Sequence, residues 1–271
     1  MTYRPLFRFP GSKWRLMPKY ISLFPEHRHY ISVFGGSATD LFRKRPSPQE
    51  TFNDLDQIIV TVFEVLQDDR LVEQVKRKIA IPHCRLLFCD ALSVISSDIA
   101  DPVTAAAAFL TVAGQGMCSS HRRKSRETAW TVHSRLEHLA GWLRMPETIN
   151  LDRCRLTGVN LRNEHCLALI QELDAPDAFF FLDPPYFGVD PLYAVTMSGE
   201  DHWRLLQLLH TIKGRAMLCG YRNPLYDNLL TDWHRHEFDV VTTLDMQGNR
   251  TKRKETVWCN YDPATTKLWT P

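Results

Sequence analysis

The apolar run Ala178-Phe-Phe-Phe-Leu182 leads directly into Asp183-Pro184-Pro185-Tyr186, and this junction decides the fold. The run is apolar without alternation, as expected for a strand that is buried on both faces of a parallel sheet. The two prolines fix the backbone in a stiff turn and offer no N–H donor. Because ligands of open α/β sheets lie beyond the carboxyl ends of the strands, the turn is predicted to belong to a binding site.

The polar groups of this turn suit an exocyclic amine of a nucleic-acid base. The Asp183 carboxylate and the Pro184 carbonyl can each accept one N–H of such an amine, and Tyr186 can stack on the base. An amine inside a duplex is out of reach, so the base would have to be flipped out. The alternative is an ordinary strand that ends in a Pro-Pro turn, with Asp183 as a helix cap.

Working outward, strands and helices are predicted to alternate as in a parallel α/β sheet. The β-branched and aromatic residues 30–34 predict a strand that stops at two glycines, and residues 50–53 predict a second strand. Apolar residues at helical spacing predict helices over 55–66 and 70–79. The same reasoning predicts a helix over 163–173 and strands over 215–219, 236–242 and 256–260.

The predicted fold class is therefore α/β, with a Rossmann-like sheet and an inserted, mainly helical subdomain. Residues 1–70 and 151–271 are assigned to the sheet domain. Residues 71–150 have helical periodicity and are rich in Arg and His, so they are assigned to the insertion.

A second candidate site follows the first strand. Gly35 and Gly36 allow a ligand to approach the backbone closely, and Ser37 is predicted to cap a short helix through Phe42. Asp54 directly follows the next strand. It lies about 20 residues after the two glycines, which is the separation at which nucleotide-binding βαβ units place an acid that binds ribose hydroxyls. The alternative is a plain glycine turn and an ordinary helix start.

Lys13 lies on a tight turn after Phe9, Pro10 and Gly11. A lysine in this position can meet the carboxylate of a ligand as a point charge. A solvated surface lysine is the alternative.

Composition excludes several classes of protein. The 271 residues are 44% hydrophobic and 24% charged, which is ordinary globular usage, and the formal net charge is only +2. Seven cysteines without a C-x-x-C pair argue against a disulfide scaffold and a zinc ribbon, so no metal is expected. The longest apolar run, residues 103–113, is shorter than the roughly 20 residues of a membrane span, and no signal peptide is expected. We expect a cytoplasmic protein.

Taken together and in their order along the chain, the sequence motifs resemble those of the DNA adenine N6-methyltransferases of the DPPY type, which depend on S-adenosylmethionine. The resemblance covers essentially the whole chain. It is carried by FPGSK (9–13), YISVFGGSATDLF (30–42), TFNDLDQIIVTVFEVLQDD (51–69), FFFLDPPY (179–186), GRAMLCGYRNPLYDNLL (214–230) and NRTKRKETVWCNY (249–261).

The resemblance implies a role for each matching residue. Lys13 would contact the methionine carboxylate of the cofactor, Asp54 would bind the ribose, and Asn160 or Leu161 would lie beside the cofactor adenine. Asp183, Pro184, Pro185 and Tyr186 would hold the target adenine. The full set expected at the cofactor is Phe9, Gly11, Lys13, Phe34, Gly35, Gly36, Ser37, Asp54, Asn160, Leu161 and Asp183.

Two basic clusters are candidates for contact with double-stranded DNA, because Arg side chains read guanine or neutralise phosphates. The alternative is that each cluster is a solvated face. The protein is expected to act as a monomer or weak dimer on DNA. The candidate residues are Arg122, Arg123, Lys124 and Arg126 in the insertion, and Arg250, Lys252 and Arg253 near the C-terminus.

The reaction implied is direct methyl transfer from the sulfonium to adenine N6 without a covalent enzyme intermediate. Methylation of cytosine N4 or of RNA is an alternative, because the chemistry of exocyclic amines is similar. A DNA-binding relative without catalysis is a second alternative, since Ser12 replaces a glycine usual in the family. A dinucleotide-dependent oxidoreductase is disfavoured, because no G-x-G-x-x-G follows the first strand.

Overall fold

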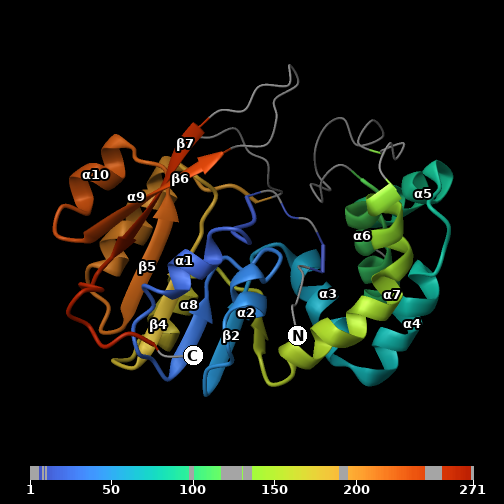
Figure 1. Cartoon of the computed structure of the whole chain (residues 1–271), viewed down its shortest axis with the longest axis horizontal. Coiled ribbons are helices and arrows are strands. Elements are labelled where there is room, and N and C mark those ends of the chain that lie inside the picture. Colours follow the sequence, from blue (N-terminus) through green and yellow to red (C-terminus); the bar gives the residue numbers. More distant parts are fainter. Residues whose placement is uncertain are drawn as a thin grey trace.

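The computed structural model describes residues 6–269 apart from 8, 10, 98–100, 117–129, 131–135, 189–194 and 242–251. Its centre is a seven-stranded sheet in the order β3-β2-β1-β4-β5-β7-β6 (Figure 1). The strands are β1 (His29–Ser32), β2 (Gln49–Asn53), β3 (Asn160–Arg162), β4 (Ala178–Leu182), β5 (Arg215–Gly220), β6 (His234–Val241) and β7 (Lys252–Cys259).

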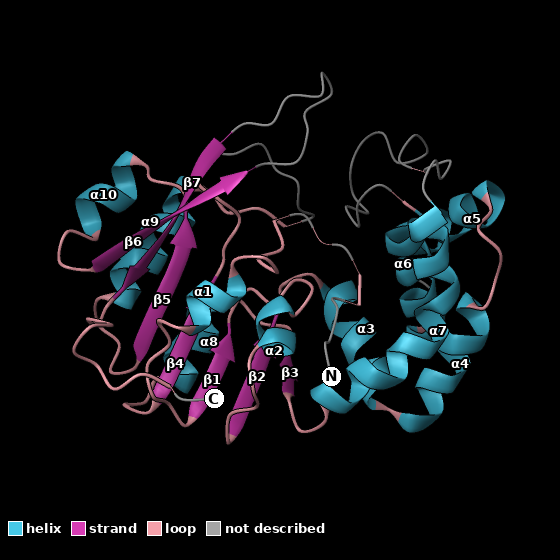
Figure 2. Cartoon of the chain, viewed as in Figure 1, coloured by secondary structure: helices cyan, strands magenta, loops and turns pink. Residues whose placement is uncertain are grey.

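The five strands from β3 to β5 pair in parallel, whereas β7 lies antiparallel between β5 and β6. The predicted α/β class with a Rossmann-like parallel sheet is confirmed. Figure 2 shows the helices on both sides of the sheet and in a separate group beside β3. The helices are α1 (Met17–Ile21), α2 (Thr39–Arg43), α3 (Gln57–Gln67), α4 (Asp69–Ile79), α5 (Arg85–Ser96), α6 (Pro102–Gln115), α7 (Leu136–Leu156), α8 (Cys166–Leu173), α9 (Gly199–Leu209) and α10 (Pro224–Leu229).

Alternate residues of the central strands supply two separate cores. Tyr30 of β1 and Phe179 of β4 pack with α1, α2 and α3, whereas Ile31 and Phe180 pack with α8, α9 and α10. Strand residues alternate between the two faces of a sheet, so an uninterrupted apolar run is what a strand covered on both faces requires. This explains why residues 178–182 were predicted as a buried strand.

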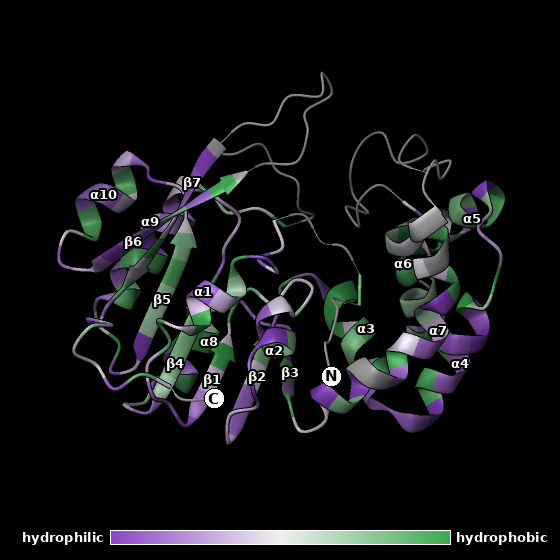
Figure 3. Cartoon of the chain, in the orientation of Figure 1, coloured by the Kyte–Doolittle hydropathy of each residue, from purple (hydrophilic) through white to green (hydrophobic). Residues whose placement is uncertain are grey.

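The middle of the chain is mainly helical where it is described, as predicted. Trp142 of α7 is buried, and its indole N–H donates to the Ile81 carbonyl at 2.9 Å. A Cβ on Gly114 of α6 would lie 2.5 Å from the Trp142 ring, so the glycine permits close packing of these helices. In Figure 3 the outer helix α4 is mostly hydrophilic (purple).

The division at residue 150 stays a prediction, since α7 runs through it and one core joins the helical region to the sheet. None of the helices in the described ranges is both long and apolar enough to cross a membrane.

Two local predictions were wrong. Ser37 does not cap α2, because the helix follows Ala38, which has a left-handed backbone (φ 52°), and no side chain caps it. The helix predicted from residue 163 begins at Cys166. The Asn163 side chain donates to the Asp54 carbonyl at 2.7 Å, and these residues form a loop. Tertiary hydrogen bonds here take the place of a first helical turn.

A buried ion cluster joins the helical region to the sheet at the edge of β2. Arg155 of α7 donates to both oxygens of the Glu50 carboxylate, at 2.6 and 2.9 Å, and Lys44 lies 2.5 Å from Oε1. All three side chains are at most 5% exposed. Burial opposes ionisation of Glu50, but Arg155 and Lys44 outweigh it and lower the pKa of this carboxyl group.

We predict that Arg155→Ala lowers the free energy of unfolding by about 3 kcal/mol, because a buried carboxylate loses its bidentate partner. Arg153→Ala is the matched control two residues earlier on α7. Its partner Asp69 is 82% exposed, so a change below about 1 kcal/mol is expected. Urea denaturation of the two variants measures both values, and equal losses would contradict the role given to the buried cluster.

Candidate active site

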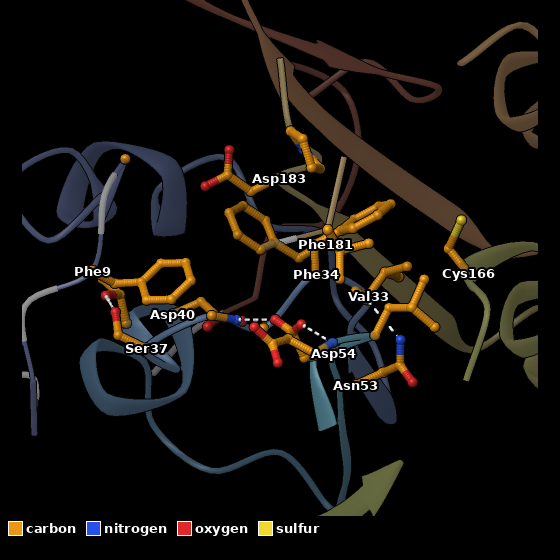
Figure 4. Close-up of a pocket in the computed structure, with 18 of the residues that line it drawn as sticks. Phe9, Val33, Phe34, Ser37, Asp40, Asn53, Asp54, Cys166, Phe181 and Asp183 are labelled. Atoms are coloured by element: carbon orange, nitrogen blue, oxygen red, sulfur yellow. Dashed lines mark hydrogen bonds between the residues drawn. The ribbon is translucent and has the colours of Figure 1, made fainter. Parts of the chain in front are cut away.

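The carboxyl ends of β1, β2 and β4 meet at one edge of the sheet. Ser32 of β1 pairs in register with Phe52 of β2 and with Phe181 of β4, so the segments that follow these strands emerge side by side. A cavity opens at this edge (Figure 4). Its walls include Phe9, Gly11, Ser12, Lys13, Phe34, Gly35, Gly36, Ser37, Asp40, Asn53, Asp54, Glu164, His165, Cys166, Phe181, Asp183 and Pro185.

Two glycines shape the loop after β1, and each position requires glycine for a different physical reason. A Cβ on Gly35 would lie 2.0 Å from the Phe52 ring, so the packing of β2 requires glycine there. Gly36 has a φ of +51°, which favours glycine, and a Cβ there would lie 3.1 Å from the Phe9 ring. The predicted glycine turn is thus fixed by the protein's own packing.

The N-terminal turn lies against this loop. Ser12 Oγ is 2.9 Å from the Thr39 hydroxyl, and Ser37 Oγ is 3.0 Å from the same oxygen. Three hydroxyls therefore join two motifs that are distant in the sequence. As a result Phe9, Gly11 and Lys13 lie on the same cavity as Gly36, and their contact with a cofactor stays a prediction.

Asp54 is held by backbone donors from two directions. The N–H of Gly36 donates to Oδ2 at 2.8 Å, and the N–H of Asp56 donates to Oδ1 at 2.8 Å (Figure 4). These two donors fix the direction of the carboxylate, which can only accept hydrogen bonds when it is ionised. The carboxylate is thus oriented for a ligand with hydroxyl groups.

The far wall of the cavity comes from residues that the sequence analysis did not select. The Asn53 side chain donates to the carbonyls of Val33 and Glu164, and it accepts from the Glu164 N–H at 2.9 Å. These bonds bring Glu164, His165 and Cys166 to the cavity.

Asn160 and Leu161 lie earlier, on β3, outside the set of cavity-lining residues. The sequence analysis predicted no strand at β3, so no local pattern pointed to the residues beyond Arg162.

Asp183 lies at the other end of the cavity and is 20% exposed. Its Oδ1 atom is 3.0 Å from Lys13 Nζ. Lys13 also donates to the Gly11 carbonyl at 2.8 Å, so the structure places it beside the Asp-Pro-Pro-Tyr turn. Contact between Lys13 and the methionine carboxylate stays a prediction. Helix α9 begins at Gly199 with Ser198 as its cap, and Asp183 caps none of the described helices.

Tyr186 lies within an aromatic and charged cluster at the same end. Lys13 Nζ is 4.7 Å from its ring centroid, and the Tyr221 ring is edge-on at 4.8 Å. The Tyr186 hydroxyl donates to Glu255 of β7, which the sequence analysis did not select. Burial, reinforced by the charge of Asp183, raises the pKa of the Glu255 carboxyl group.

Of the predicted DNA-contacting residues, Arg253 is described in full. Its guanidinium lies 5.6 Å from the Tyr221 ring centroid, at the Tyr186 side of the cavity. Lys252 begins β7, and its side chain lies outside the description. Arg122, Arg123, Lys124, Arg126 and Arg250 also lie outside the described residues, so their roles stay predictions.

No group of three or more His, Cys, Asp or Glu side chains in the described part of the chain is arranged to hold a metal ion. The cavity is lined by aromatic rings and by several acidic side chains, among them Asp54 and Asp183, and such a mixed lining suits an organic ligand.

A known protein family matches most of the chain. No curated protein matches the chain. The family model for D12 class N6 adenine-specific DNA methyltransferases matches residues 9–244, which include the N-terminal turn, the glycine loop, Asp54 and the Asp-Pro-Pro-Tyr turn. The chain therefore belongs to the D12 class N6 adenine-specific DNA methyltransferase family.

Proposed function

We propose that this protein transfers a methyl group from S-adenosylmethionine to the N6 amine of an adenine that is flipped out of duplex DNA at a specific site. The main observation is the position of two carboxylates on one cavity. Figure 4 shows Asp54 at one end and Asp183 at the other, with Phe34 and Phe181 between them. One acid suits a ribose and the other a base amine, which is what a cofactor and a target adenine require together.

The residues of the first end fit S-adenosylmethionine. The Asp54 carboxylate is oriented by two backbone donors and can accept from the ribose hydroxyls. The segment 164–166 would line the part of the cavity that holds the adenine of the cofactor. The glycine loop would line the part that holds the methionine group of the cofactor. When bound, the cofactor supplies a methyl group on an activated sulfonium.

The residues of the second end act on the target amine. Asp183 and the Pro184 carbonyl would each accept one N–H, which takes the nitrogen lone pair out of conjugation and aims it along the cavity. Since Lys13 engages Oδ1 of Asp183, the other oxygen is the one left to face the amine. An amine that takes the methyl group in exchange for the methyl–sulfur bond must lose one proton, and the Asp183 carboxylate that accepts its N–H would receive that proton.

We predict that the protein transfers labelled methyl groups from S-adenosylmethionine to unmethylated duplex DNA, and that Asp183→Ala lowers this rate at least about 100-fold. The cofactor and DNA should still bind, because Asp183 acts on the amine. Nucleoside analysis of the product identifies N6-methyladenine, and Asp232→Ala at an exposed position is the control.

Three results would contradict this proposal in different ways. N4-methylcytosine, or labelled RNA, would change the substrate. Near wild-type activity of the variant would remove Asp183 from the mechanism. Absence of both transfer and cofactor binding would favour a silent DNA-binding relative.

We predict that Asp54→Ala weakens S-adenosylmethionine binding about 10- to 100-fold, because hydrogen bonds to a charged acceptor contribute about 1.5–3 kcal/mol. Isothermal titration calorimetry without DNA measures this change directly. Glu64→Gln removes an exposed carboxylate from α3 and should leave the dissociation constant unchanged. An unaltered affinity of Asp54→Ala would refute the assignment to the ribose.

Arg253→Ala should weaken duplex binding to a similar extent for all sequences and reduce the slope of log K against log salt by about 1, if the side chain neutralises one phosphate. Fluorescence anisotropy over a range of salt concentrations gives the slope. Arg204→Ala removes a cation that is already paired with Glu200 and is the matched control. Equal slopes for both variants would place Arg253 away from the DNA backbone.

A further inference from the structure

Glu255 is a buried acid on a strand that otherwise carries exposed charge. It lies on β7 between Lys254, which is exposed and paired with Glu237, and Thr256, which is buried. Side chains alternate along a strand, so Glu255 faces the opposite side from Lys254. Its side chain is 5% exposed and reaches the turn after β4.

The contacts of Glu255 join three residues of the candidate site. The Tyr186 hydroxyl donates to its Oε1 atom, and Lys13 Nζ lies 3.4 Å from the same oxygen. Lys13 is in turn 3.0 Å from Asp183 Oδ1 and lies over the Tyr186 ring. One ammonium group therefore lies between two carboxylates, and a tyrosine hydroxyl closes the cluster.

The arrangement has an energetic reason. A buried carboxylate is strongly unfavourable without partners, and here the partners of Glu255 belong to two other segments of the site. The ammonium attracts both acids, while the two acids repel each other. Removal of either acid would shift the lysine toward the other, so the position of Lys13 depends on Glu255 as well as on Asp183.

We propose that Glu255 is a positioning residue for methyl transfer: it fixes the Tyr186 hydroxyl and the Lys13 ammonium so that Asp183 presents its second oxygen to the target amine. This proposal rests on the proposed function. It assigns Glu255 no contact with the cofactor or the base.

The charge on Glu255 gives the proposal a pH signature. Burial and the nearby Asp183 raise its pKa, so as the pH falls through that raised value Glu255 becomes neutral and releases its hold on Lys13. Activity should then be lost on the acid side. The other titratable groups that face Glu255 are Lys13, Tyr20 of α1, Asp183, Tyr186 and Cys219 of β5.

The first test compares Glu255→Gln with wild type in steady-state methylation of duplex DNA. Glutamine keeps the size of the side chain and an oxygen that accepts from Tyr186, but it removes the charge that holds Lys13. We expect kcat to fall about 100-fold, with KM for S-adenosylmethionine and for DNA unchanged within about 2-fold. Glu237→Gln on β6, which removes the partner of Lys254, should keep wild-type kcat.

Two further readouts separate positioning from a merely structural role. The acid limb of the kcat profile should move to lower pH in Glu255→Gln, because glutamine does not titrate. Tyr186→Phe removes only the hydroxyl, and its loss of kcat should not add fully to that of Glu255→Gln in the double variant. A lowered melting temperature with an unmoved acid limb and additive losses would overturn the proposal.

The controls keep the two hypotheses apart. A wild-type protein that neither binds the cofactor nor methylates DNA refutes the proposed function itself. An active wild type with wild-type kcat in Glu255→Gln refutes only the role of Glu255. Should Glu255→Gln fail to fold, full activity of Tyr186→Phe over the whole pH range would still overturn the proposal, while a lowered kcat with an acid limb moved to higher pH would support it.

Discussion

The pairing of β1 between β2 and β4 is the constraint on which the site depends. Buried backbone N–H and C=O groups must be hydrogen-bonded, and on a central strand the two neighbouring strands supply those bonds. Ser32 is therefore held opposite Phe52 and Phe181. The segments that follow the three strands leave the sheet side by side at the same edge. The glycine loop, Asp54 and Asp183 come together because of this register, although they are far apart in the sequence. A shift of one residue would turn every side chain to the other face and separate the two acids.

Asp54 and Asp183 are held by different physical means. Asp54 accepts from two neutral backbone donors, which fix the direction of its carboxylate. Asp183 is paired with the Lys13 ammonium, which is shared with Glu255. The first arrangement suits an acceptor that only has to bind hydroxyls. The second suits the role proposed for Asp183, in which one oxygen is engaged by a cation and the other would face the target amine.

Sequence reasoning succeeded where local pattern and environment agree. Residues 178–182 are apolar throughout because both faces of β4 are covered, so the predicted strand has the observed bounds. Asp54 and the glycine loop lie on the cavity because both follow strands directly. The segment 164–166 escaped prediction, since hydrogen bonds from Asn53 rather than any local pattern bring it to the cavity. Glu255 escaped for a similar reason: its sequence neighbours are basic, and only the antiparallel insertion of β7 beside β5 turns it toward Tyr186.

The antiparallel strand β7 therefore contributes two residues, Glu255 and Arg253, to the surroundings of Tyr186. Glu255 contacts Tyr186 directly through the hydroxyl, while Arg253 lies over Tyr221, whose ring packs edge-on against Tyr186. Both sets of contacts involve Tyr186, whose ring is proposed to contact the target base. If Arg253 binds a phosphate beside that base, β7 contacts the DNA backbone through Arg253. The same strand holds the cluster of Lys13 and Asp183 through Glu255. Binding of the DNA backbone and alignment of the acceptor oxygen of Asp183 would then both depend on the same strand.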